Sequence, residues 1–470
     1  QNRDQYFRTN MGVGILGHTY AFNSKTLMKT TLAYSGQGIN SKHYQVVRRQ
    51  DFKPKDTLPL ILDYNFNEYK ATLSWYVKHK INAKNSFKTG FLANLITIDF
   101  YDKIKINGLF DTVPTSIQNK PFKNREEVKT SFWLLQPYFA YVHKFNDKLT
   151  LNAGVYSQLF TLNNSWAVEP RASIRYDMTA NQSLSFSYGL HSQLQPTYIY
   201  YALPDSIVNN GVLIANLQRN PTNKDLGFSR SQHFVLGYDV FPSKYLRIKT
   251  EIFYQNLWDI PVYVMPSGVS LINRGATFTR FYPMYTMVNN GTGYNYGLEF
   301  TLEKLFHNNF FLLYSGSLFD SKYTGSDGKL NNTDYNGNYL MNLLAGYELK
   351  LGKEKKNSIS FGTKFTYGGG RRYSPVNVAA SNKIMDIVPI NDSINSLQFD
   401  PYNRLDLRVT YKINGKKVST EIALDILNIL STKNVLALSY APDPADLTKD
   451  PLIKNYQLGF LPLLYVKVDF

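Results

Sequence analysis

The feature that most constrains the fold is a set of long segments in which apolar and polar side chains alternate residue by residue. In residues 404–413, for example, Leu405 and Leu407 alternate with Arg404 and Arg408. Successive side chains of a β-strand point to opposite faces, so this period of two predicts strands with one apolar and one polar face. Alternation alone also fits a soluble β-domain. However, many of these segments continue for about 12 to 20 residues, whereas strands of soluble domains cluster near five or six, so the length favours a transmembrane β-barrel.

Short polar turns and long connections alternate along the chain. The short turns are rich in Asn, Asp, Gly, Ser and Lys, residues that accept turn dihedral angles. They are predicted at 23–26, 82–86, 146–148, 179–183, 242–244, 307–309, 352–357 and 414–417. The long connections are predicted near 48–60, 105–126, 161–167, 202–224, 265–284, 325–337, 375–401 and 441–454. Short turns on one side and long loops on the other are typical of outer-membrane barrels.

The number of strands follows from these connections, which join roughly seventeen alternating segments. If the short turns are periplasmic, the first segment, about residues 9–22, runs inward from outside, and the last segment also ends in the periplasm. Single-chain bacterial barrels usually have an even number of strands with both ends on the periplasmic side. We therefore expect residues 1–470 to form one all-β domain, a large antiparallel transmembrane β-barrel that lacks at least its first strand.

Composition excludes several other classes of protein. The 470-residue chain has no cysteine, so it needs neither a disulfide framework nor a cysteine-ligated metal. No run of about 18 apolar residues is present, which excludes a helical membrane span. The 52 basic and 35 acidic residues give a net charge of +17. Because the basic residues are spread over turns, loops and polar strand faces, we expect no nucleic-acid partner.

No motif for catalysis or metal binding stands out. The seven histidines are scattered with no two at a metal-ligand spacing, and no Ser, His and Asp arrangement with a nucleophile elbow appears. We therefore expect no enzyme activity, no cofactor and no metal site. Calcium stays open as an alternative for one oxygen-rich loop, although this loop misses the spacing of a calcium-binding loop. Its residues are Asp327, Asn331, Asn332, Asp334 and Asn336.

The polar strand faces are expected to line a hydrated or plugged lumen, because charge and bare backbone cannot face hydrocarbon. The residues expected to face the lumen are Ser185, Ser187, His191, Glu299, Arg404, Asp406 and Arg408. The other histidines are expected in the wall or on the surface: His18, His43, His79, His143, His233 and His307. The alternating residues expected to face lipid include Leu184, Phe186, Leu405, Leu407, Val466 and Val468.

Several stretches are more specific than their alternation. They are SLSFSYGLHSQLQP (183–196), NKDLGFSRSQHFVLGYD (223–239), VNNGTGYNYGLEFTLEK (288–304), FTYGGGRRYSP (365–375), NRLDLRVTYKING (403–415) and the terminal YQLGFLPLLYVKVDF. These stretches resemble the C-terminal barrel region of TonB-dependent receptors from Bacteroidetes-type bacteria. The resemblance implies a barrel of about 22 strands around an N-terminal plug. The first segment here is then roughly the sixth strand, and the plug and TonB box are missing ahead of it.

The resemblance also implies a function at the bacterial outer membrane. Receptors of this kind take up large or scarce substrates with energy from the inner-membrane TonB complex, which acts through the plug. The implied partners are outer-membrane lipids, the TonB complex and a surface lipoprotein or larger membrane complex, and Phe470 matches the terminal aromatic that marks a chain for barrel insertion. Two alternatives stay open: an accessory barrel that scaffolds an outer-membrane assembly and, ranked last, a passive porin, whose constricting loop is not identified here.

Most of the binding determinants are expected in three of the longer connections, at 202–224, 265–284 and 375–401, and in the rim at Arg371 and Arg372. These connections lie opposite the tight turns, where a ligand arrives. They hold amphipathic residue types that recur at recognition surfaces. The candidate ligand-binding residues of these loops and of the adjoining rim are Arg274, Arg280, Tyr282, Arg371, Arg372, Tyr373 and Asn391. The alternative is that the loops only shield the barrel mouth and that the rim is a solvated loop base.

Overall fold

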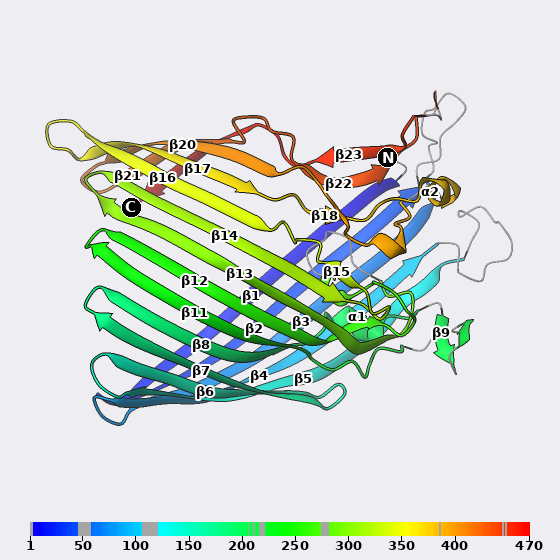
Figure 1. Cartoon of the computed structure of the whole chain (residues 1–470), viewed down its shortest axis with the longest axis horizontal. Helices are drawn as coiled ribbons and strands as arrows, with labels where there is room; N and C mark the ends of the chain where they lie inside the picture. Colours follow the sequence, from blue (N-terminus) through cyan, green and yellow to red (C-terminus); the bar gives the residue numbers. More distant parts are fainter. Residues whose placement is uncertain are drawn as a thin grey trace.

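The computed structural model shows a large antiparallel β-barrel with short turns on one side and long loops on the other (Figure 1). It describes residues 3–45, 58–105, 121–204, 206–209, 212–215, 221–273, 282–384, 387–443, 446 and 449–470. Within these ranges the main sheet has 18 strands, one of which, β15, contains only three residues. The seventeen strands that remain confirm the number and the fold class expected from the sequence.

The long strands follow the order of the chain around the wall. Their bounds are β1 (Arg3–Asn23), β2 (Thr26–Gln45), β3 (Leu60–Lys80), β4 (Asn85–Ile104), β5 (Lys123–Lys144), β6 (Leu149–Phe160), β7 (Ser165–Thr179), β8 (Gln182–Gln193), β11 (Ser229–Ser243), β12 (Leu246–Tyr263), β13 (Met287–His307), β14 (Phe310–Thr324), β16 (Tyr339–Leu351), β17 (Asn357–Gly368), β20 (Tyr402–Asn414), β21 (Ser419–Leu427) and β24 (Leu461–Asp469). Each pairs antiparallel with the next long strand.

Short elements belong to the loop side. They are α1 (Thr197–Tyr201), β9 (Ser206–Asn209), β10 (Val212–Ala215), η2 (Leu271–Asn273), β15 (Leu330–Asn332), β18 (Arg372–Tyr373), α2 (Val378–Ile384), η3 (Asn391–Ser393), β19 (Leu397–Gln398), β22 (Val435–Tyr440) and β23 (Leu452–Tyr456). No helix in the described part of the chain is long and apolar enough to cross a membrane.

All of the predicted tight turns join neighbouring strands, so these predictions are confirmed. Side chains that accept local hydrogen bonds explain several of them. The Asn82 Oδ1 accepts hydrogen bonds from the backbone N–H groups of Lys84 and Asn85, at 2.9 and 2.8 Å. Gly352 has a φ of +81°, a left-handed conformation that glycine adopts without steric cost.

The two ends of the sheet lie on opposite sides. β1 begins on the loop side, where Arg3 is opposite Gln45, and β24 ends on the turn side, where Asp469 is opposite Ser419. Figure 1 marks the two chain ends accordingly. Among the described residues, β1 pairs only with β2 and β24 only with β21, so the sheet has two edges.

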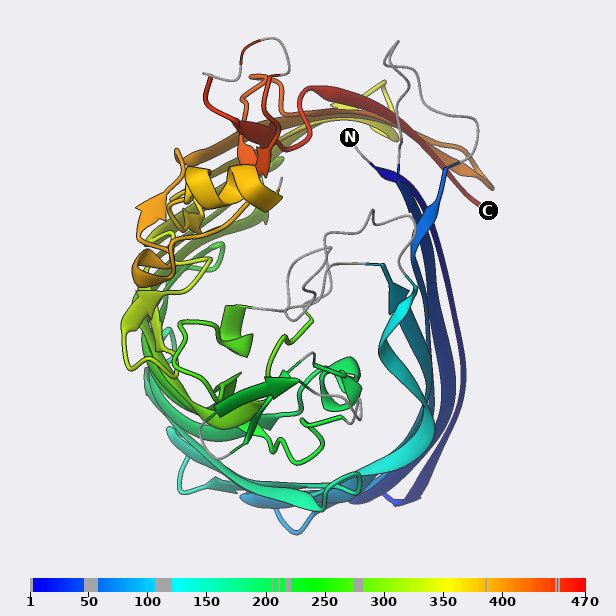
Figure 2. The same ribbon diagram turned by 90° about the vertical axis from the view of Figure 1, so that its right-hand side faces the viewer.

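The inner face of the wall is identified by α1, which lies inside the curve of the sheet (Figure 2). Thr197 in α1 donates a hydrogen bond to Glu68, and the Tyr198 ring contacts the Phe66 ring edge-on. The face of β3 that carries Phe66 and Glu68 is therefore the inner face. Strand register extends this assignment across the sheet, because residues directly opposite each other point to the same side.

The alternating pattern predicts a polar inner face, but the inner face is not polar throughout. At the loop-side ends of β4 to β6, Ile98, Phe100, Phe132 and Phe160 are buried in an apolar cluster together with Tyr200 of α1. The expectation of a polar inner face is wrong here because a loop segment folds back into the barrel and removes these side chains from water.

Candidate functional site

The segment around α1 folds back inside the loop-side mouth of the barrel and is fixed there. We call this segment the ledge. The Tyr200 ring packs against Phe160 with 5.3 Å between centroids, and its hydroxyl accepts a hydrogen bond from the backbone N–H of Gln195 at 3.2 Å. Burial raises the pKa of the Tyr200 phenol, which therefore stays neutral. Since Ile199 beside it is fully buried as well, the ledge is part of the folded wall.

Two asparagines tie this ledge to neighbouring strands. The buried Asn223 donates to the carbonyl of Ile199 at 3.3 Å and accepts from the N–H of Met287 at 2.9 Å. Asn289 accepts from the N–H of Gly227 at 2.9 Å and donates to the carbonyl of Asp259 at 2.7 Å. Asparagine suits both positions because its amide offers a donor and an acceptor at once.

The glycines of the 288–304 stretch serve close backbone packing. A Cβ added at Gly291 would lie 2.7 Å from the carbonyl oxygen of Ile260, and one at Gly297 would lie 2.4 Å from that of Leu318. No side chain fits at these distances, so the glycines let β13 pass close to its neighbours.

Tyr282 joins three segments at the mouth. The Arg125 guanidinium binds both carboxylate oxygens of Asp102 at 2.8 Å and lies 4.7 Å from the centre of the Tyr282 ring. The Tyr282 hydroxyl accepts a hydrogen bond from the N–H of Leu203 at 3.4 Å. Burial raises the pKa of the Tyr282 phenol, and the negative charges of Glu126 and Asp102 raise it further. Tyr282 is therefore a neutral, largely enclosed contact that connects β4, β5 and the segment after α1.

The rim residues at the end of β17 are also tied to neighbouring loops. The Arg372 side chain donates to the Asn336 carbonyl at 2.9 Å and to the Asn338 Oδ1 at 2.7 Å. The Arg371 guanidinium lies 4.9 Å from the centre of the Tyr335 ring, and its side chain stays about one third exposed, at 31%. The Tyr373 ring stacks on Phe399 with 4.1 Å between centroids. Arg371 thus keeps partial access to solvent, although its guanidinium also lies 3.9 Å from the Asp334 carboxylate.

The oxygen-rich loop after β14 is held by amide side chains. Asn395 donates to the Asp334 Oδ1 at 2.8 Å, and Asn336 donates to the Asp320 Oδ1 at 2.7 Å. Within the described ranges, no group of three His, Cys, Asp or Glu residues could hold a metal ion. Asp334 and Asn336, two of the five residues of the candidate calcium loop, are thus engaged in hydrogen bonds within the protein.

Of the remaining candidate residues, the structure describes Asn391. Asn391 is exposed in η3, where its neighbour Asp392 forms an ion pair with Lys329 at 2.6 Å. The hydrogen bond from Lys329, together with its positive charge, lowers the pKa of the Asp392 carboxyl. Arg274 and Arg280 lie outside the described residues. The structure therefore brings Arg371, Arg372 and Tyr373 together, but it leaves Tyr282 and Asn391 at other parts of the mouth.

A row of polar side chains, which we call the belt, crosses the inner face on the turn side of the apolar cluster. Its hydrogen bonds run from β3 to β13 in two connected groups. The first group consists of Thr72, Asn94, Gln136, Gln158, Glu169, Arg171 and Ser192, and the second of Ser231, His233, Gln255 and Asn295. His191, which precedes Ser192 of the first group, and His233 of the second group have ring centroids 4.8 Å apart.

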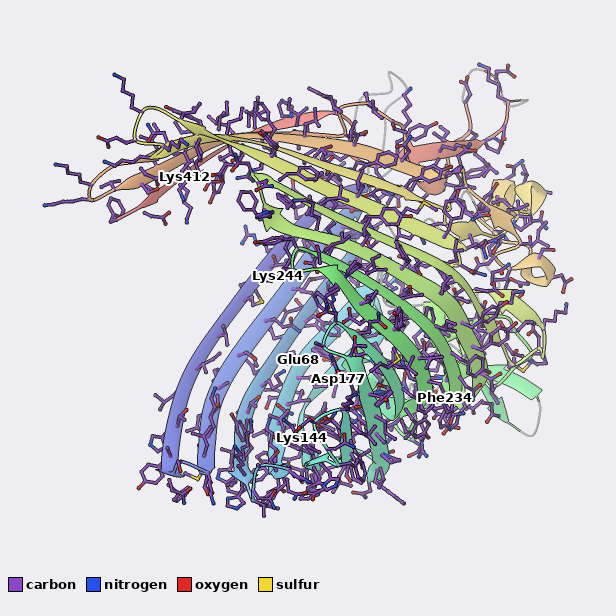
Figure 3. All side chains as sticks on the ribbon, turned by 60° about the vertical axis from the view of Figure 1, so that its left-hand side comes forward. Glu68, Lys144, Asp177, Phe234, Lys244 and Lys412 are labelled. Atoms are coloured by element: carbon purple, nitrogen blue, oxygen red, sulfur yellow. The ribbon has the colours of Figure 1, made fainter. Side chains whose placement is uncertain are left out.

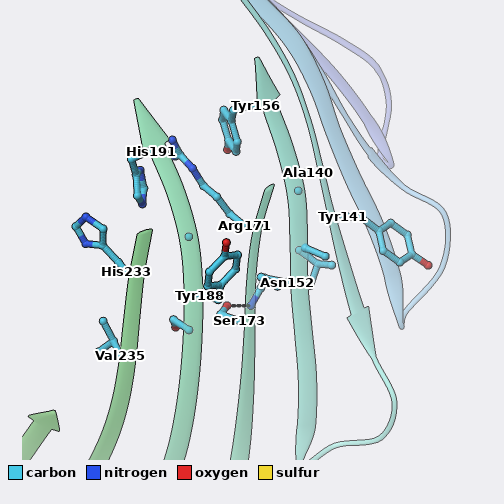
Figure 4. A pocket seen from close by; sticks show the side chains of 16 residues that line it. Ala140, Tyr141, Asn152, Tyr156, Arg171, Ser173, Tyr188, His191, His233 and Val235 are labelled. Carbon is cyan, nitrogen blue, oxygen red and sulfur yellow. Dashed lines mark hydrogen bonds between the residues drawn. The ribbon is translucent and has the colours of Figure 1, made fainter. Parts of the chain in front are cut away.

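A cavity of about 430 Å³ adjoins this belt on its turn side. Tyr156, Arg171, His191 and His233 stand at one end of the cavity (Figure 4), and the Arg171 guanidinium lies 4.3 Å from the centre of the Tyr156 ring. The sequence interpretation assigned His233 to the wall or surface. Register instead places His233 opposite Gly189, on the same inner face as His191. Only the pairing of β8 with β11, across a long connection, reveals this contact.

Comparison with protein families bears directly on this architecture. The family described as TonB dependent receptor-like, beta-barrel matches residues 1–429. The chain belongs to this family. Its members are receptors of the bacterial outer membrane rather than enzymes, so the expected location and the expected class of protein are confirmed. A comparison with curated proteins finds no match.

Solved structures of three receptors share the fold. The ferric preacinetobactin receptor BauA of Acinetobacter baumannii has 16% identity and a TM-score of 0.62, with 99% of this chain and 64% of BauA covered. The ferric-catecholate import receptor Fiu of E. coli has 11% identity and a TM-score of 0.64, with 98% and 64% covered. The pyoverdine receptor FpvA of Pseudomonas aeruginosa has 14% identity and a TM-score of 0.62, with 100% and 62% covered. The chain thus spans less than two thirds of each receptor.

The residues expected to face the lumen fall into separate parts of the TonB-dependent receptor wall. Ser185, Ser187 and His191 alternate along β8, and Glu299 lies opposite Glu251 on β12. On β20, the Arg404 Nε donates to Asp406 at 2.7 Å, and Arg408 pairs with Glu421 and Asp425 at 3.1 and 3.3 Å. The terminal Phe470 is 99% exposed.

Proposed function

We propose that this chain forms the barrel wall of a TonB-dependent transporter that takes up a large or scarce ligand across the outer membrane. The observation that carries the proposal is a wall of long antiparallel strands whose loop-side mouth is partly filled by a folded, hydrogen-bonded ledge. A barrel with this mouth presents recognition groups on rigid supports, which lowers the entropic cost of ligand binding. Membership of the TonB-dependent family supports the energy source.

The ligand site that we propose lies on the loop side. It comprises Arg371, Arg372 and Tyr373 at the end of β17, together with Arg274, Arg280, Tyr282 and Asn391. BauA, Fiu and FpvA are named for ferric preacinetobactin, ferric catecholates and pyoverdine. Ferric chelates are therefore the first ligands to test on this chain, and the guanidinium groups of the rim suit an anionic chelate.

Several parts of the proposal concern the whole transporter. We propose that strands and a plug domain ahead of Gln1 complete a barrel of about 22 strands, and that TonB acts through this plug. We also propose that the protein belongs to the Bacteroidetes-type subgroup and that a surface lipoprotein or a larger membrane complex joins it. The polar face with Ser185, Ser187, His191 and Glu299, as well as Arg404, Asp406 and Arg408, would line the lumen.

Uptake measurements in cells test this function. The complete protein is expressed in cells with and without TonB, and accumulation of radioactive iron from catecholate and hydroxamate chelates is measured. Accumulation of one chelate that requires both the protein and TonB is the expected result. Equal accumulation without TonB would point to a passive pore.

Substitution of the rim tests the location of the site. We expect Arg371→Ala to weaken binding of the transported chelate by about tenfold, because a charge-assisted hydrogen bond is lost. The variant Lys25→Ala removes an exposed cation from the turn side and should bind the chelate normally. Unchanged binding in the Arg371 variant would remove the rim from the site.

We also propose that Phe470 marks the chain for insertion into the membrane. Deleting this residue should reduce the amount of barrel in the outer membrane while leaving the unfolding of the assembled fraction almost unchanged, because its side chain is fully exposed. Normal outer-membrane levels of a chain ending at Asp469 would contradict this role.

A further inference from the structure

The turn side of the barrel is strongly basic. Nine lysines lie between the strands in the tight turns, all of which the structure describes, and every one of them is exposed. They are Lys25, Lys84, Lys148, Lys244, Lys353, Lys355, Lys356, Lys416 and Lys417. The same turns hold only two carboxylates, Asp147 and Glu354. A strong excess of positive charge therefore follows one rim of the barrel.

The charge is densest where two hairpins meet. Lys353, Lys355 and Lys356 lie in the turn between β16 and β17, and Lys416 and Lys417 lie in the turn between β20 and β21. These turns adjoin because β17 pairs with β20 and Asn414 donates a hydrogen bond to the Lys356 carbonyl at 2.6 Å. Figure 3 shows both hairpins, with Lys412 labelled on β20, projecting at this end of the wall.

Most of this charge is not neutralised locally. Glu354 forms an ion pair with Lys356. Among the residues that the structure describes, the other four lysines, Lys353, Lys355, Lys416 and Lys417, take part in no ion pair. We call these four residues the basic hairpin cluster.

The apolar outer face of the same strands continues up to this cluster. Leu349 and Leu351 on β16 are 39% and 37% exposed, and Tyr411 and Ile413 on β20 are both 39% exposed. Lys353 follows Leu351 by two residues and Lys416 follows Ile413 by three. A strand advances about 3.3 Å per residue, so the ammonium groups stand within about 10 Å of the end of the apolar surface. This is the depth of lipid head groups, which lysine reaches by extending its stem along apolar surface.

We propose that the basic hairpin cluster binds the phosphate groups of anionic phospholipids in the leaflet on the turn side. The proposal rests on the membrane placement of the barrel proposed above. Lysines beside an anionic membrane surface each strengthen its attraction several-fold. A soluble acidic protein is the competing partner, but the exposed leucines and Ile413 directly beside the cluster favour lipid, because an acidic protein surface would leave them in water.

Lipid retention tests this proposal without any transported ligand. The full chain is reconstituted into vesicles of equal parts phosphatidylethanolamine and phosphatidylglycerol, released in mild detergent, and its bound lipids are counted by native mass spectrometry. The test variant carries Lys353→Gln, Lys355→Gln, Lys416→Gln and Lys417→Gln. We expect wild type to retain phosphatidylglycerol in preference to phosphatidylethanolamine. In this variant, the ratio of retained phosphatidylglycerol to phosphatidylethanolamine should fall at least about fivefold.

A matched variant removes the same charge without touching the cluster. Lys25→Gln, Lys84→Gln, Lys148→Gln and Lys244→Gln neutralise one lysine in each of four other turns, and we expect this variant to keep most of the preference.

Molar salt should abolish the preference of wild type, because exposed charges are screened within about 3 Å at that concentration. Equal preference in the wild-type protein and the cluster variant would overturn the proposal. So would normal lipid retention together with a loss of binding to polyglutamate, which would indicate an acidic protein partner. The wild-type protein and the two variants must show the heat-dependent gel shift of a folded barrel. Wild type alone, in vesicles with phosphatidylcholine in place of phosphatidylglycerol, supplies a test that needs no variant.

Discussion

Two parts of the inner wall differ in character although their strands alternate in the same way. At the loop-side ends of β4 to β6, the inner face carries Phe100, Phe132 and Phe160, which are buried under α1. On β20 and β21, the inner face carries an ion-pair network in which the Arg408 side chain is 41% exposed. The comparison shows that alternation determines which side chains share a face. Whether those side chains can be apolar depends on whether a loop segment, such as the one with α1, packs over that face.

The two parts also differ in how they stabilise the barrel. Burial of apolar surface contributes about 25 cal/mol per Å², so each enclosed aromatic of the first part contributes substantially. Exposed ion pairs contribute only about 0 to 1 kcal/mol, because water and salt screen them. We therefore expect stability to be concentrated in the first part, and the following substitutions test that expectation.

The largest effect is expected at Phe160. The variant Phe160→Ala removes a fully buried ring that packs on Phe132 and Tyr200, and should lower the free energy of unfolding by about 3 to 5 kcal/mol. Urea unfolding in phosphatidylcholine vesicles measures it. Tyr465→Ala on β24 is the matched aromatic of the second part, where Arg408 lies 5.3 Å from the ring centre, and should cost about 0.5 to 1 kcal/mol. Equal losses in the two variants would remove the distinction between the parts.

A somewhat smaller effect tests the assignment of the two faces. Phe186 and Ser185 are neighbours on β8, with Phe186 on the outer face and 48% exposed. Phe186→Arg places a charge toward lipid and should cost about 2 to 4 kcal/mol at mid-membrane depth, whereas Ser185→Arg should cost close to zero. The same unfolding measurement applies, and a larger loss for Ser185→Arg would show that the faces are reversed.

Sequence reasoning identified those features that depend on local physical chemistry. The alternation on β8 and β20 follows from the strand period, and turns such as 82–86 follow from asparagine side chains that bond to nearby N–H groups. The ledge at α1 and the contact between the rings of His191 and His233 were missed. Both depend on contacts between segments far apart in the chain, whose favourable free energy has no periodic signature in the sequence.

The rim also shows that contacts between distant segments cannot be predicted from the local sequence. The basic and glycine-rich run before Tyr373 indicated a loop base or an anion-binding rim, and both descriptions fit what the sequence contains. The glycines have a packing reason, since a Cβ at Gly369 would lie 1.7 Å from the Gly337 carbonyl oxygen. Only the partners of Arg372 on a distant loop show that one of the two arginines is used to hold that loop.

An intermediate effect is expected at the asparagine that holds the ledge. Asn223→Ala leaves the carbonyl of Ile199 and the N–H of Met287 without this partner inside the wall, which should cost about 1 to 3 kcal/mol. Limited proteolysis should then cut residues 194–228 faster than in wild type. Asn181→Ala, in an exposed tight turn, is the control and should leave the cleavage rate unchanged. Protection equal to wild type in the Asn223 variant would mean that apolar packing alone holds the ledge.

The smallest effect is expected on the exposed part of the comparison. Arg408→Ala breaks the ion pairs with Glu421 and Asp425, at 3.1 and 3.3 Å, but these groups already contact water, so the free energy of unfolding should fall by only about 0 to 1 kcal/mol. Because the Debye length shortens from about 10 Å at 0.1 M salt to 3 Å at 1 M, the difference from wild type should vanish at high salt, whereas the loss at Phe160 should persist. A loss of about 3 kcal/mol that salt does not reduce would show that Arg408 behaves as a buried charge, and that the second part of the wall is covered after all.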